Sequence, residues 1–490
     1  MACTAVRTAF PANVVILEKL ARQRPGSDAV TVIGARSHLR QLDLSREDEQ
    51  DVLAQLDRDA PVAISRSQGR IVLVHRSAKG PRARQLEVAR RAGAEMATIL
   101  NSAGRRSAQL QAVLKDAELV LALAEGALLG GYRFRKYKTS GTGPTLGSLK
   151  VVGTVVDIKA VQELNDVVMA VCAARDLVNE PVSFLNATQL SAEIRTLARN
   201  TPGLKVQVLD KAQIEALGMG GLLAVNKGSL DPPTFNILEY KPRRAVNEAP
   251  LVLIGKGVVY DTGGLSLKPT PHSMDYMKCD MAGGAAVIGA IAAAAQQDLP
   301  LHLVALVPAT DNRPGGNAFA PGDVVRMHNG LTVEVMNSDA EGRMILADAL
   351  SYAERYGPEL VITVATLTGA AARAIGQQGI VGMGTADERT MRSLVNAGER
   401  VHERIALFPF WEEYDKELES EIADMKNLGG DSAGMITAGK FLARFTRRPY
   451  FHLDIAGPAY LMRADGYRPQ GGTGVGVRLL YRFLRDRAGR

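Results

Sequence analysis

The sequence predicts an α/β protein whose larger part is built on a central, mostly parallel sheet flanked by helices. Short aliphatic runs alternate with stretches of helical pattern in the second part of the chain, and most of the runs lead into loops that contain glycine. This alternation is typical of parallel strands joined by crossover helices. Aromatic residues make up only 5% of the chain, which favours close helix packing over an all-β sandwich. The length of 490 residues indicates two or three domains.

Composition and cysteine usage are those of an ordinary globular protein. Hydrophobic residues make up 46% and charged residues 23% of the chain. No run of about 18 uninterrupted apolar residues predicts a membrane helix, and the longest apolar segment, 282–295, predicts a buried helix. Cys3, Cys172 and Cys279 lie far apart without a pairing pattern, which favours a reducing compartment. We therefore expect a cytoplasmic protein that does not enter membranes. A mitochondrial presequence is the alternative, although Glu18 interrupts its pattern.

The net charge of +7 comes largely from Arg and Lys clusters in the first 110 residues. Such clusters usually form solvated helix faces, which is the interpretation we favour. A surface that faces nucleic acid is the alternative. No aromatic residues alternate with the basic ones in these clusters, so the alternative has no further support.

Residues 1–150 are expected to form a smaller N-terminal α/β domain. Its pattern predicts strands at 29–33 and 70–75 and helices at 83–103 and 107–115. This part carries no convergent acids, no Cys/His cluster and no phosphate loop. We therefore expect a structural or regulatory role for it.

A linker and a connecting helix, together residues 151–180, are expected to join the two domains. Residues 139–148 are rich in Gly, Ser and Thr, as loops are. A helix is predicted at 159–178, and it should end at 179–181 because Pro disfavours helix in the residue before it. The larger domain then comprises residues 181–490.

Four aliphatic runs predict the strands of the larger domain, at 251–255, 302–308, 331–336 and 360–365. Helices at 282–297 and 343–356 separate some of them. In sheets of this kind a ligand binds outside the carboxyl ends of the strands. The residues that bind a ligand or take part in catalysis are therefore expected just after each run.

Acidic, basic and small polar residues, with one leucine among them, follow these aliphatic runs. In chain order they are Lys256, Asp261, Lys268, Asp275, Asp280, Asp311, Asn312, Asp339, Glu341, Arg343, Thr366, Leu367, Thr368 and Gly369. An extended segment would aim the acids of Asp339 and Glu341 to one side, whereas a helix would not. Taken alone, this pair is typical of a solvated surface. A cluster that is rich in carboxylates and poor in histidine favours two bridged divalent ions over a single zinc.

Other catalytic motifs are missing from the sequence. The segment 255–257 (Gly-Lys-Gly) lacks the spacing and the Ser/Thr of a phosphate loop. There is no His-Glu-x-x-His and no Gly-x-Ser-x-Gly. The histidine nearest to the cluster, His272, is expected to be solvated.

The run Asn-Ser-Asp-Ala-Glu-Gly-Arg at 337–343 resembles the signature of the leucyl (cytosol) aminopeptidase family, Asn-Thr-Asp-Ala-Glu-Gly-Arg-Leu. Ser338 and Met344 replace the Thr and Leu of that signature. Further segments match in the same order, at 255–264 with Lys268, 275–280, 365–370 and 452–457. The resemblance covers roughly residues 125–465, whereas the first 115 residues do not match.

The resemblance implies a dinuclear metal site in the larger domain. Two divalent ions, Zn²⁺ or Mn²⁺ with Mg²⁺ or Co²⁺ as alternatives, would be held by Lys256, Asp261, Asp280, Asp339 and Glu341. Lys268 and Arg343 would be the catalytic pair, with a bicarbonate ion at Arg343. The substrate cleft would be lined by Thr366, Leu367 and Gly369. The loop before Asp280 is one residue longer than the family pattern, which leaves Asp275 as a competing ligand.

The implied function is a metallo-aminopeptidase that removes N-terminal residues, with a preference for leucine, from peptides. The resemblance also implies a homohexamer. Two other hypotheses are a DNA-binding role, since the chain is basic, and a catalytically silent scaffold subunit. The complete set of ligands argues against the silent subunit.

Overall fold

The computed structural model describes residues 14–42, 44–58, 60–67, 69–140 and 145–489. Cys3 and the segment considered as a presequence lie outside this range, apart from Glu18 and its neighbours. The chain forms two compact units, and the boundary falls at Cys172 within α4 (Ile158–Asn179). The first unit also includes residues 462–470, and the second comprises 173–461 and 471–490. The helix predicted at 159–178 is confirmed, and it ends at Asn179 as expected.

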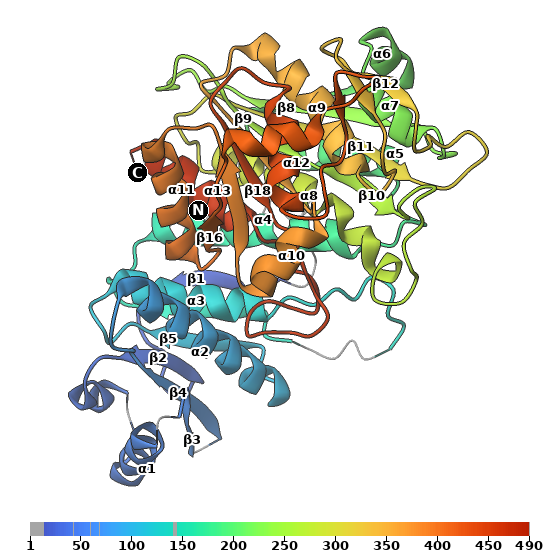
Figure 1. Ribbon diagram of the computed structural model, residues 1–490. Helices are drawn as coiled ribbons and strands as arrows, with labels where there is room; N and C mark the ends of the chain where they lie inside the picture. Colours follow the sequence, from blue (N-terminus) through green and yellow to red (C-terminus); the bar gives the residue numbers. More distant parts are fainter. Residues whose placement is uncertain (1–13, 43, 59, 68, 141–144, 490) are drawn as a thin grey trace. The chain divides into compact units, whose positions relative to one another are not determined.

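The first unit contains a six-stranded sheet in the order β1-β6-β5-β2-β4-β3, in which only β3 runs antiparallel to its neighbour (Figure 1). Its strands are β1 (Ile16–Leu20), β2 (Ala29–Ile33), β3 (Ala63–Ser67), β4 (Arg70–Arg76), β5 (Ser107–Gln111) and β6 (Ser148–Val152). Its helices are η1 (Arg36–Gln41), α1 (Arg46–Asp57), α2 (Arg82–Ser102) and α3 (Ala117–Gly130). The predicted strands at 29–33 and 70–75 and the helix at 83–103 are confirmed.

The helix predicted at 107–115 is wrong, because Ser107–Gln111 forms strand β5. The segment Ser-Ala-Gln-Leu-Gln is short and carries no strong periodicity. It lies between β6 and β2 and pairs with both of them in parallel. Two ladders of backbone hydrogen bonds therefore outweigh the modest helix propensity of Ala, Leu and Gln.

The second unit is built on a nine-stranded sheet in the order β16-β15-β18-β14-β9-β11-β8-β7, with β10 paired to β11. Five of its neighbouring pairs are parallel and three are antiparallel, which confirms a mostly parallel sheet. Its strands are β7 (Leu204–Leu209), β8 (Thr234–Tyr240), β9 (Leu251–Gly255), β10 (Gly257–Asp261), β11 (Leu303–Asn312), β14 (Leu360–Ala365), β15 (Ile380–Gly384), β16 (Ile405–Leu407) and β18 (Tyr450–Asp454).

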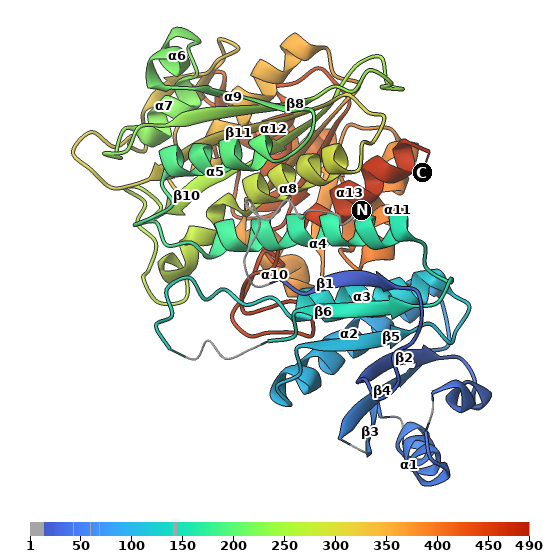
Figure 2. The ribbon, with the colours of Figure 1, turned by 180° about the vertical axis from the view of Figure 1, so that it is seen from behind.

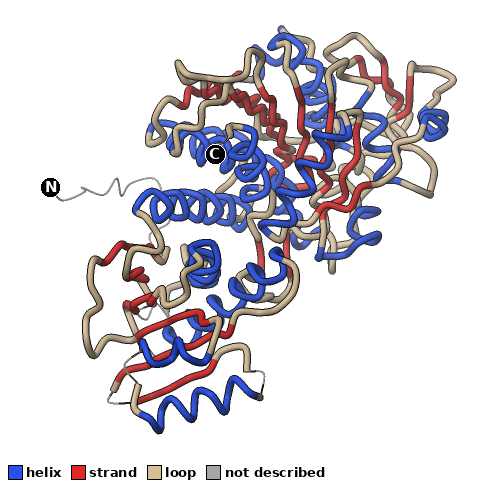
Figure 3. Tube along the Cα trace, turned by 90° about the vertical axis from the view of Figure 1, so that its left-hand side faces the viewer, coloured by secondary structure: helices blue, strands red, loops and turns tan. Residues whose placement is uncertain are grey.

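Helices cover both faces of this sheet (Figures 1–3). One face packs against α5 (Ala187–Arg199) and α8 (Ala282–Gln296), and α13 (Val477–Arg487) packs on α8. The other face packs against α7 (Gly220–Asn226), α9 (Glu341–Ala353) and α12 (Gly434–Ala443). The remaining helices are α6 (Lys211–Ala216), η2 (Met274–Met281), η3 (Glu354–Tyr356), α10 (Gly369–Ile375), η4 (Gly376–Gln378), α11 (Glu388–Val401) and η5 (Glu412–Leu418). The predicted helices at 282–297 and 343–356 correspond to α8 and to α9 with η3.

The strands at the centre of the sheet are mostly aliphatic because both of their faces are covered. All residues of β9, β11 and β14 are buried. Helix α8 packs so closely on β9 that a Cβ on Gly255 would lie 2.6 Å from the carbonyl oxygen of Gly283. Within the described residues, one helical stretch, 274–296, is long and apolar enough to cross a membrane, but 94% of its most apolar window is buried inside the protein. The predicted buried helix at 282–295 is thus confirmed.

The sequence predicts a strand of the central sheet at 331–336, and this prediction is wrong. The run contains strand β13 (Thr332–Glu334), which lies in a separate small sheet between β12 (Val324–Arg326) and β17 (Met425–Lys426). Only three of its residues are extended, and their burial alternates, as expected for a strand with one solvated face. A two-stranded ribbon, β19 (Tyr460–Leu461) and β20 (Gly471–Gly472), completes the unit.

Candidate metal centre

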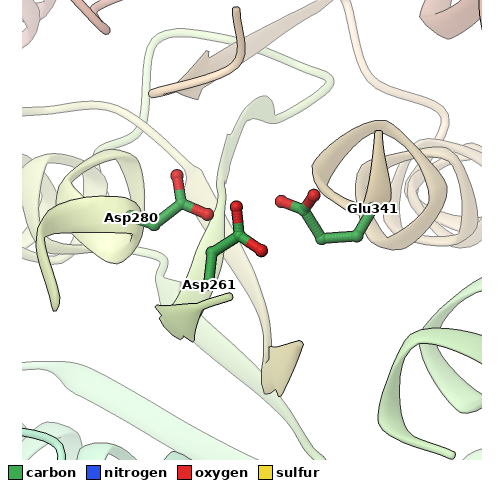
Figure 4. A group of neighbouring side chains, drawn as sticks. All are labelled: Asp261, Asp280 and Glu341. Atoms are coloured by element: carbon green, nitrogen blue, oxygen red, sulfur yellow. The ribbon is translucent and has the colours of Figure 1, made fainter. Parts of the chain in front are cut away.

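Three buried carboxylates converge at the carboxyl ends of the central strands. Asp261 is the last residue of β10, Asp280 lies in η2, and Glu341 is the first residue of α9. One carboxylate oxygen from each lies within 4.8 Å of the other two, and Figure 4 shows the three side chains pointing toward one another. The side chains are at most 3% exposed. Such a group is unstable without positive charge, because like charges at this distance repel and burial removes the screening by water.

Lys256, which directly follows β9, supplies part of that charge. Its ammonium group lies 2.7 Å from Asp280 Oδ2 and 2.8 Å from Glu341 Oε1, and it donates a hydrogen bond of 3.1 Å to the carbonyl oxygen of Thr366. Burial alone would lower the pKa of Lys256, but the carboxylates around it outweigh burial and raise the pKa above its usual value. The same crowding and burial raise the pKa of Asp280 well above its ordinary range.

Lys268 connects the group to Asp339. Its ammonium lies 2.9 Å from Asp261 Oδ2 and also pairs with Asp339 Oδ1. Asp339 precedes α9 in a turn, and its side chain is 33% exposed. Burial and repulsion from Asp261 and Glu341 raise the pKa of Asp339 to about 7. Asp339 thus lies at the edge of the cluster, and it joins the three buried carboxylates through a lysine.

The pair Asp339 and Glu341 does not lie on one strand. A turn follows β13, and Glu341 already belongs to helix α9. The turn is closed locally by Asn337, whose Oδ1 accepts a hydrogen bond of 2.7 Å from the backbone N–H of Asp339. The prediction that both acids serve one site remains compatible with the geometry, but the extended segment proposed to aim them is wrong.

Gly342 makes room for Lys256 and does not form a tight turn. A tight turn would need a positive φ, and Gly342 is instead the second residue of α9, without a positive φ. A Cβ at this position would lie 2.4 Å from Cε and 2.6 Å from Nζ of Lys256. The missing side chain therefore gives Lys256 the room to reach Glu341.

The two candidate aspartates of the η2 loop differ sharply in environment. Asp280 is 3% exposed and accepts hydrogen bonds of 2.8 Å from both Lys256 and the hydroxyl of Thr366. Asp275 is exposed, at the start of η2. His272 is exposed as well, as expected. The geometry favours Asp280 over Asp275.

Arg343 lies on α9, two residues after Glu341, and is 4% exposed. Its Nη1 donates a hydrogen bond of 2.8 Å to the carbonyl oxygen of Asn427, and its Nε has no hydrogen-bond partner. Burial lowers the pKa of Arg343 to about 10, although Glu341 and Asp454 partly oppose this. The side chain therefore stays charged at neutral pH.

The loop after β14 brings the remaining predicted residues beside the cluster. Thr366 contacts both Asp280 and Lys256. Leu367 donates its N–H to Asp454 Oδ1 at 3.2 Å. Gly369 begins α10, whose N-terminus is capped by the hydroxyl of Thr368.

Three polar residues outside the predicted set of ligands support the cluster. Asn312, at the end of β11, donates to Asp261 Oδ1 at 2.9 Å. Asp454, at the end of β18, accepts hydrogen bonds from the Thr366–Gly369 loop. Their position at the carboxyl ends of strands was a usable signal. Asn427 follows β17 in the small sheet and offered no such signal.

Comparison with known proteins identifies the family. The family model described as "Cytosol aminopeptidase family, catalytic domain" matches residues 172–481. The chain belongs to the cytosol aminopeptidase family. It is therefore a hydrolase, an aminopeptidase that depends on divalent metal ions.

Similar proteins agree with this membership. A "Probable cytosol aminopeptidase" of Syntrophotalea carbinolica is 46% identical over 409 residues, which cover 81% of this chain and 82% of the relative. One of Chlorobaculum tepidum is 46% identical over 391 residues, covering 76% and 77%. Among solved structures, the bottromycin maturation enzyme BotP in complex with Mn has a TM-score of 0.81 and 34% identity, covering 94% of this chain and 100% of that one. A mutant of tomato leucine aminopeptidase has a TM-score of 0.85 and 27% identity, covering 96% of both chains.

Proposed function

We propose that this aminopeptidase removes N-terminal residues, with a preference for leucine, from a broad range of peptides by means of two bridged divalent ions. The observation that carries the proposal is the convergence of Asp261, Asp280 and Glu341 within 4.8 Å. Lys268 pairs with both Asp261 and Asp339 and so joins a fourth carboxylate to this group; the fourth carboxylate supports a second ion. Leucine is the substrate named for the tomato relative.

The donor set fits metal ions. Both carboxylate oxygens of Glu341, Asp280 Oδ2 and Asp339 Oδ1 are buried and receive no hydrogen bond of good geometry. Lysine ammonium groups lie close to three of these four atoms and offset only part of the negative charge. Hard oxygen donors in this number suit Mn²⁺, Mg²⁺ or Zn²⁺, with Co²⁺ as a further candidate. Mn is the ion named for the BotP structure. We propose Zn²⁺ or Mn²⁺ as the working metals.

Each residue then has a distinct role. Lys256, Asp261, Asp280 and Glu341 would hold one ion, and Asp261, Asp339 and Glu341 the other. Lys256 can coordinate only after it loses the proton that it carries in the metal-free cluster. When bound, two such ions acidify a water molecule and polarise the carbonyl group of the substrate.

The catalytic pair completes the site. Lys268 would remain protonated and stabilise the oxyanion of the tetrahedral intermediate. Arg343 would hold a bicarbonate ion, which supplies a proton acceptor. Thr366, Leu367 and Gly369 would line the cleft beside the cluster and orient the peptide.

A leucine-anilide substrate tests the proposal directly. The purified enzyme, supplied with Mn²⁺ or Zn²⁺, should hydrolyse it at a rate far above that of a Glu341→Ala variant. Equal rates for the two proteins would overturn the proposal. A panel of aminoacyl anilides, with metal quantified in the same sample, establishes both the preference and the stoichiometry.

We further propose a cytoplasmic homohexamer that acts in peptide catabolism. The relatives are named cytosol aminopeptidases, and this name supports the location. Light scattering should give a mass near six times the chain mass of 52.4 kDa. A mass equal to that of one chain would exclude the assembly.

A further inference from the structure

Asn427 connects the small sheet to the turn that carries the acids of the metal centre. Its Oδ1 accepts a hydrogen bond of 2.8 Å from the backbone N–H of Met336, and its Nδ2 donates one of 2.9 Å to the carbonyl oxygen of Asn337. Its own carbonyl oxygen accepts the bond of 2.8 Å from Arg343. One residue therefore holds the beginning of the segment 337–343 by its side chain and the end of that segment by its backbone.

The small sheet explains how Asn427 arrives there. Strand β17 pairs in parallel with β13, with Lys426 opposite Glu334. The backbone N–H of Asn427 continues this ladder to the carbonyl oxygen of Glu334 at 2.9 Å. The strand pairing therefore fixes the backbone of Asn427 independently of the contacts that its side chain makes with the turn.

The side chain of Asn427 is shielded from water. Asn427 is 0% exposed, and its carboxamide uses its acceptor and its donor on the adjacent residues Met336 and Asn337. A buried N–H or C=O that loses its partner bears the full cost of desolvation. If the side chain were removed, the turn would have to shift to satisfy Met336 and Asn337, and Asp339 follows in the same turn.

We propose that Asn427 is a positioning residue for the metal centre, acting on both Asp339 and the guanidinium of Arg343. This inference rests on the proposed two-metal function. Asn427 itself touches neither the three-carboxylate group nor the reacting atoms. It acts through the turn, as hydrogen-bonding partners beyond the ligands of metal sites commonly do.

Two variants test the inference. Asn427→Ala removes both side-chain hydrogen bonds, and Asn427→Asp has the same shape but places an acceptor opposite the carbonyl oxygen of Asn337. Loss of such an outer partner typically weakens metal affinity or activity about 10–100-fold. We expect a fall of this size in Mn²⁺ affinity, measured by calorimetry. We also expect a lower kcat for leucine-anilide at saturating Mn²⁺, with KM changed much less.

Asn236→Ala is the matched control. Asn236 is also 0% exposed, and its Nδ2 donates to the carbonyl oxygen of Val307 at 3.1 Å, within the central sheet. This variant should lose thermal stability and keep its Mn²⁺ affinity and kcat. The inference is overturned if both Asn427 variants keep wild-type Mn²⁺ affinity and kcat, or if Asn236→Ala loses as much of them. Failure of the wild-type enzyme to bind either Mn²⁺ or Zn²⁺ would instead refute the proposed function.

Discussion

Replacing Gly342 by Ala should disable the metal centre although the change adds only a methyl group. In most helices this substitution is stabilising, because glycine is about 1 kcal/mol less favourable than alanine there. At Gly342 the new Cβ would lie 2.4 Å from Cε of Lys256. Carbon atoms pack at about 3.5–4.0 Å, so the lysine would have to retreat by more than about 1 Å.

That retreat separates Lys256 from its partners. Its ammonium now lies 2.8 Å from Glu341 Oε1. A displacement of this size would lengthen that distance beyond about 3.2 Å, the limit for a hydrogen bond. Misplacing a catalytic group by about 1 Å costs about 100-fold in rate, equivalent to about 2.7 kcal/mol in the activation barrier. Overpacking should also lower the free energy of unfolding by about 1–3 kcal/mol.

The assay compares kcat/KM for leucine-anilide and the Mn²⁺ affinity of wild-type enzyme, Gly342→Ala and Gly434→Ala. Gly434 begins α12, and a Cβ there would meet only the Cβ of Ala370 at 3.5 Å, which is ordinary contact. Gly434→Ala should therefore behave as wild type in both measurements. If Gly342→Ala retained wild-type kcat/KM and metal affinity, the role assigned to the missing side chain would be wrong.

Three further predictions follow from the geometry. Asp280→Asn should bind less metal and lose at least about 100-fold in activity, because displacement of a catalytic group by about 1 Å alone has that effect. Asp275→Asn, at an exposed position, should behave as wild type when metal content and anilide hydrolysis are measured. Chelation should lower Tm, and Mn²⁺ at 100 times its Kd should restore about 2.7 kcal/mol of stability; a Glu341→Ala variant that responded equally would contradict the assigned site. Burial raises the pKa of Asp348 from 3.8 to about 7. The stabilising contribution of its protonated form is therefore complete below pH 3.8 and is lost as pH rises to about 7. Between pH 5 and 7.5 the Tm of Asp348→Asn should fall less than that of the wild-type enzyme, and an equal fall would refute this.

The parts of the fold that the sequence predicted best are those whose pattern has a single physical cause. Strands β9 and β14 are almost entirely aliphatic because helices cover both of their faces. Helix α8 was predictable because its small apolar residues must pack on the sheet. The rule that ligands bind at the carboxyl ends of such strands then pointed to Lys256 and Asp261, and the structure has both residues in the buried cluster.

The parts that failed depend on partners distant in sequence. Strand β5 is extended because two neighbours pair with it, and neither neighbour is visible in its own five residues. The run at 331–336 is aliphatic enough for a central strand, but its partners are β12 and β17. Asn427 contacts Arg343 across 84 residues. A local pattern carries no information about such pairings.

The charges of the cluster explain why the metal centre needs its two lysines. At a separation of 4.8 Å, two unit charges repel by about 3.5 kcal/mol at an effective dielectric constant of 20. The buried group contains three such pairs. Lys256 and Lys268 contact four carboxylates between them, which leaves two negative charges without a partner among these residues. Burial and crowding raise the pKa values of Asp280 and Asp339, and protonation of these carboxylates would relieve part of this excess. Divalent ions would relieve it better, and their binding should therefore displace protons from Lys256 and from these two carboxylates.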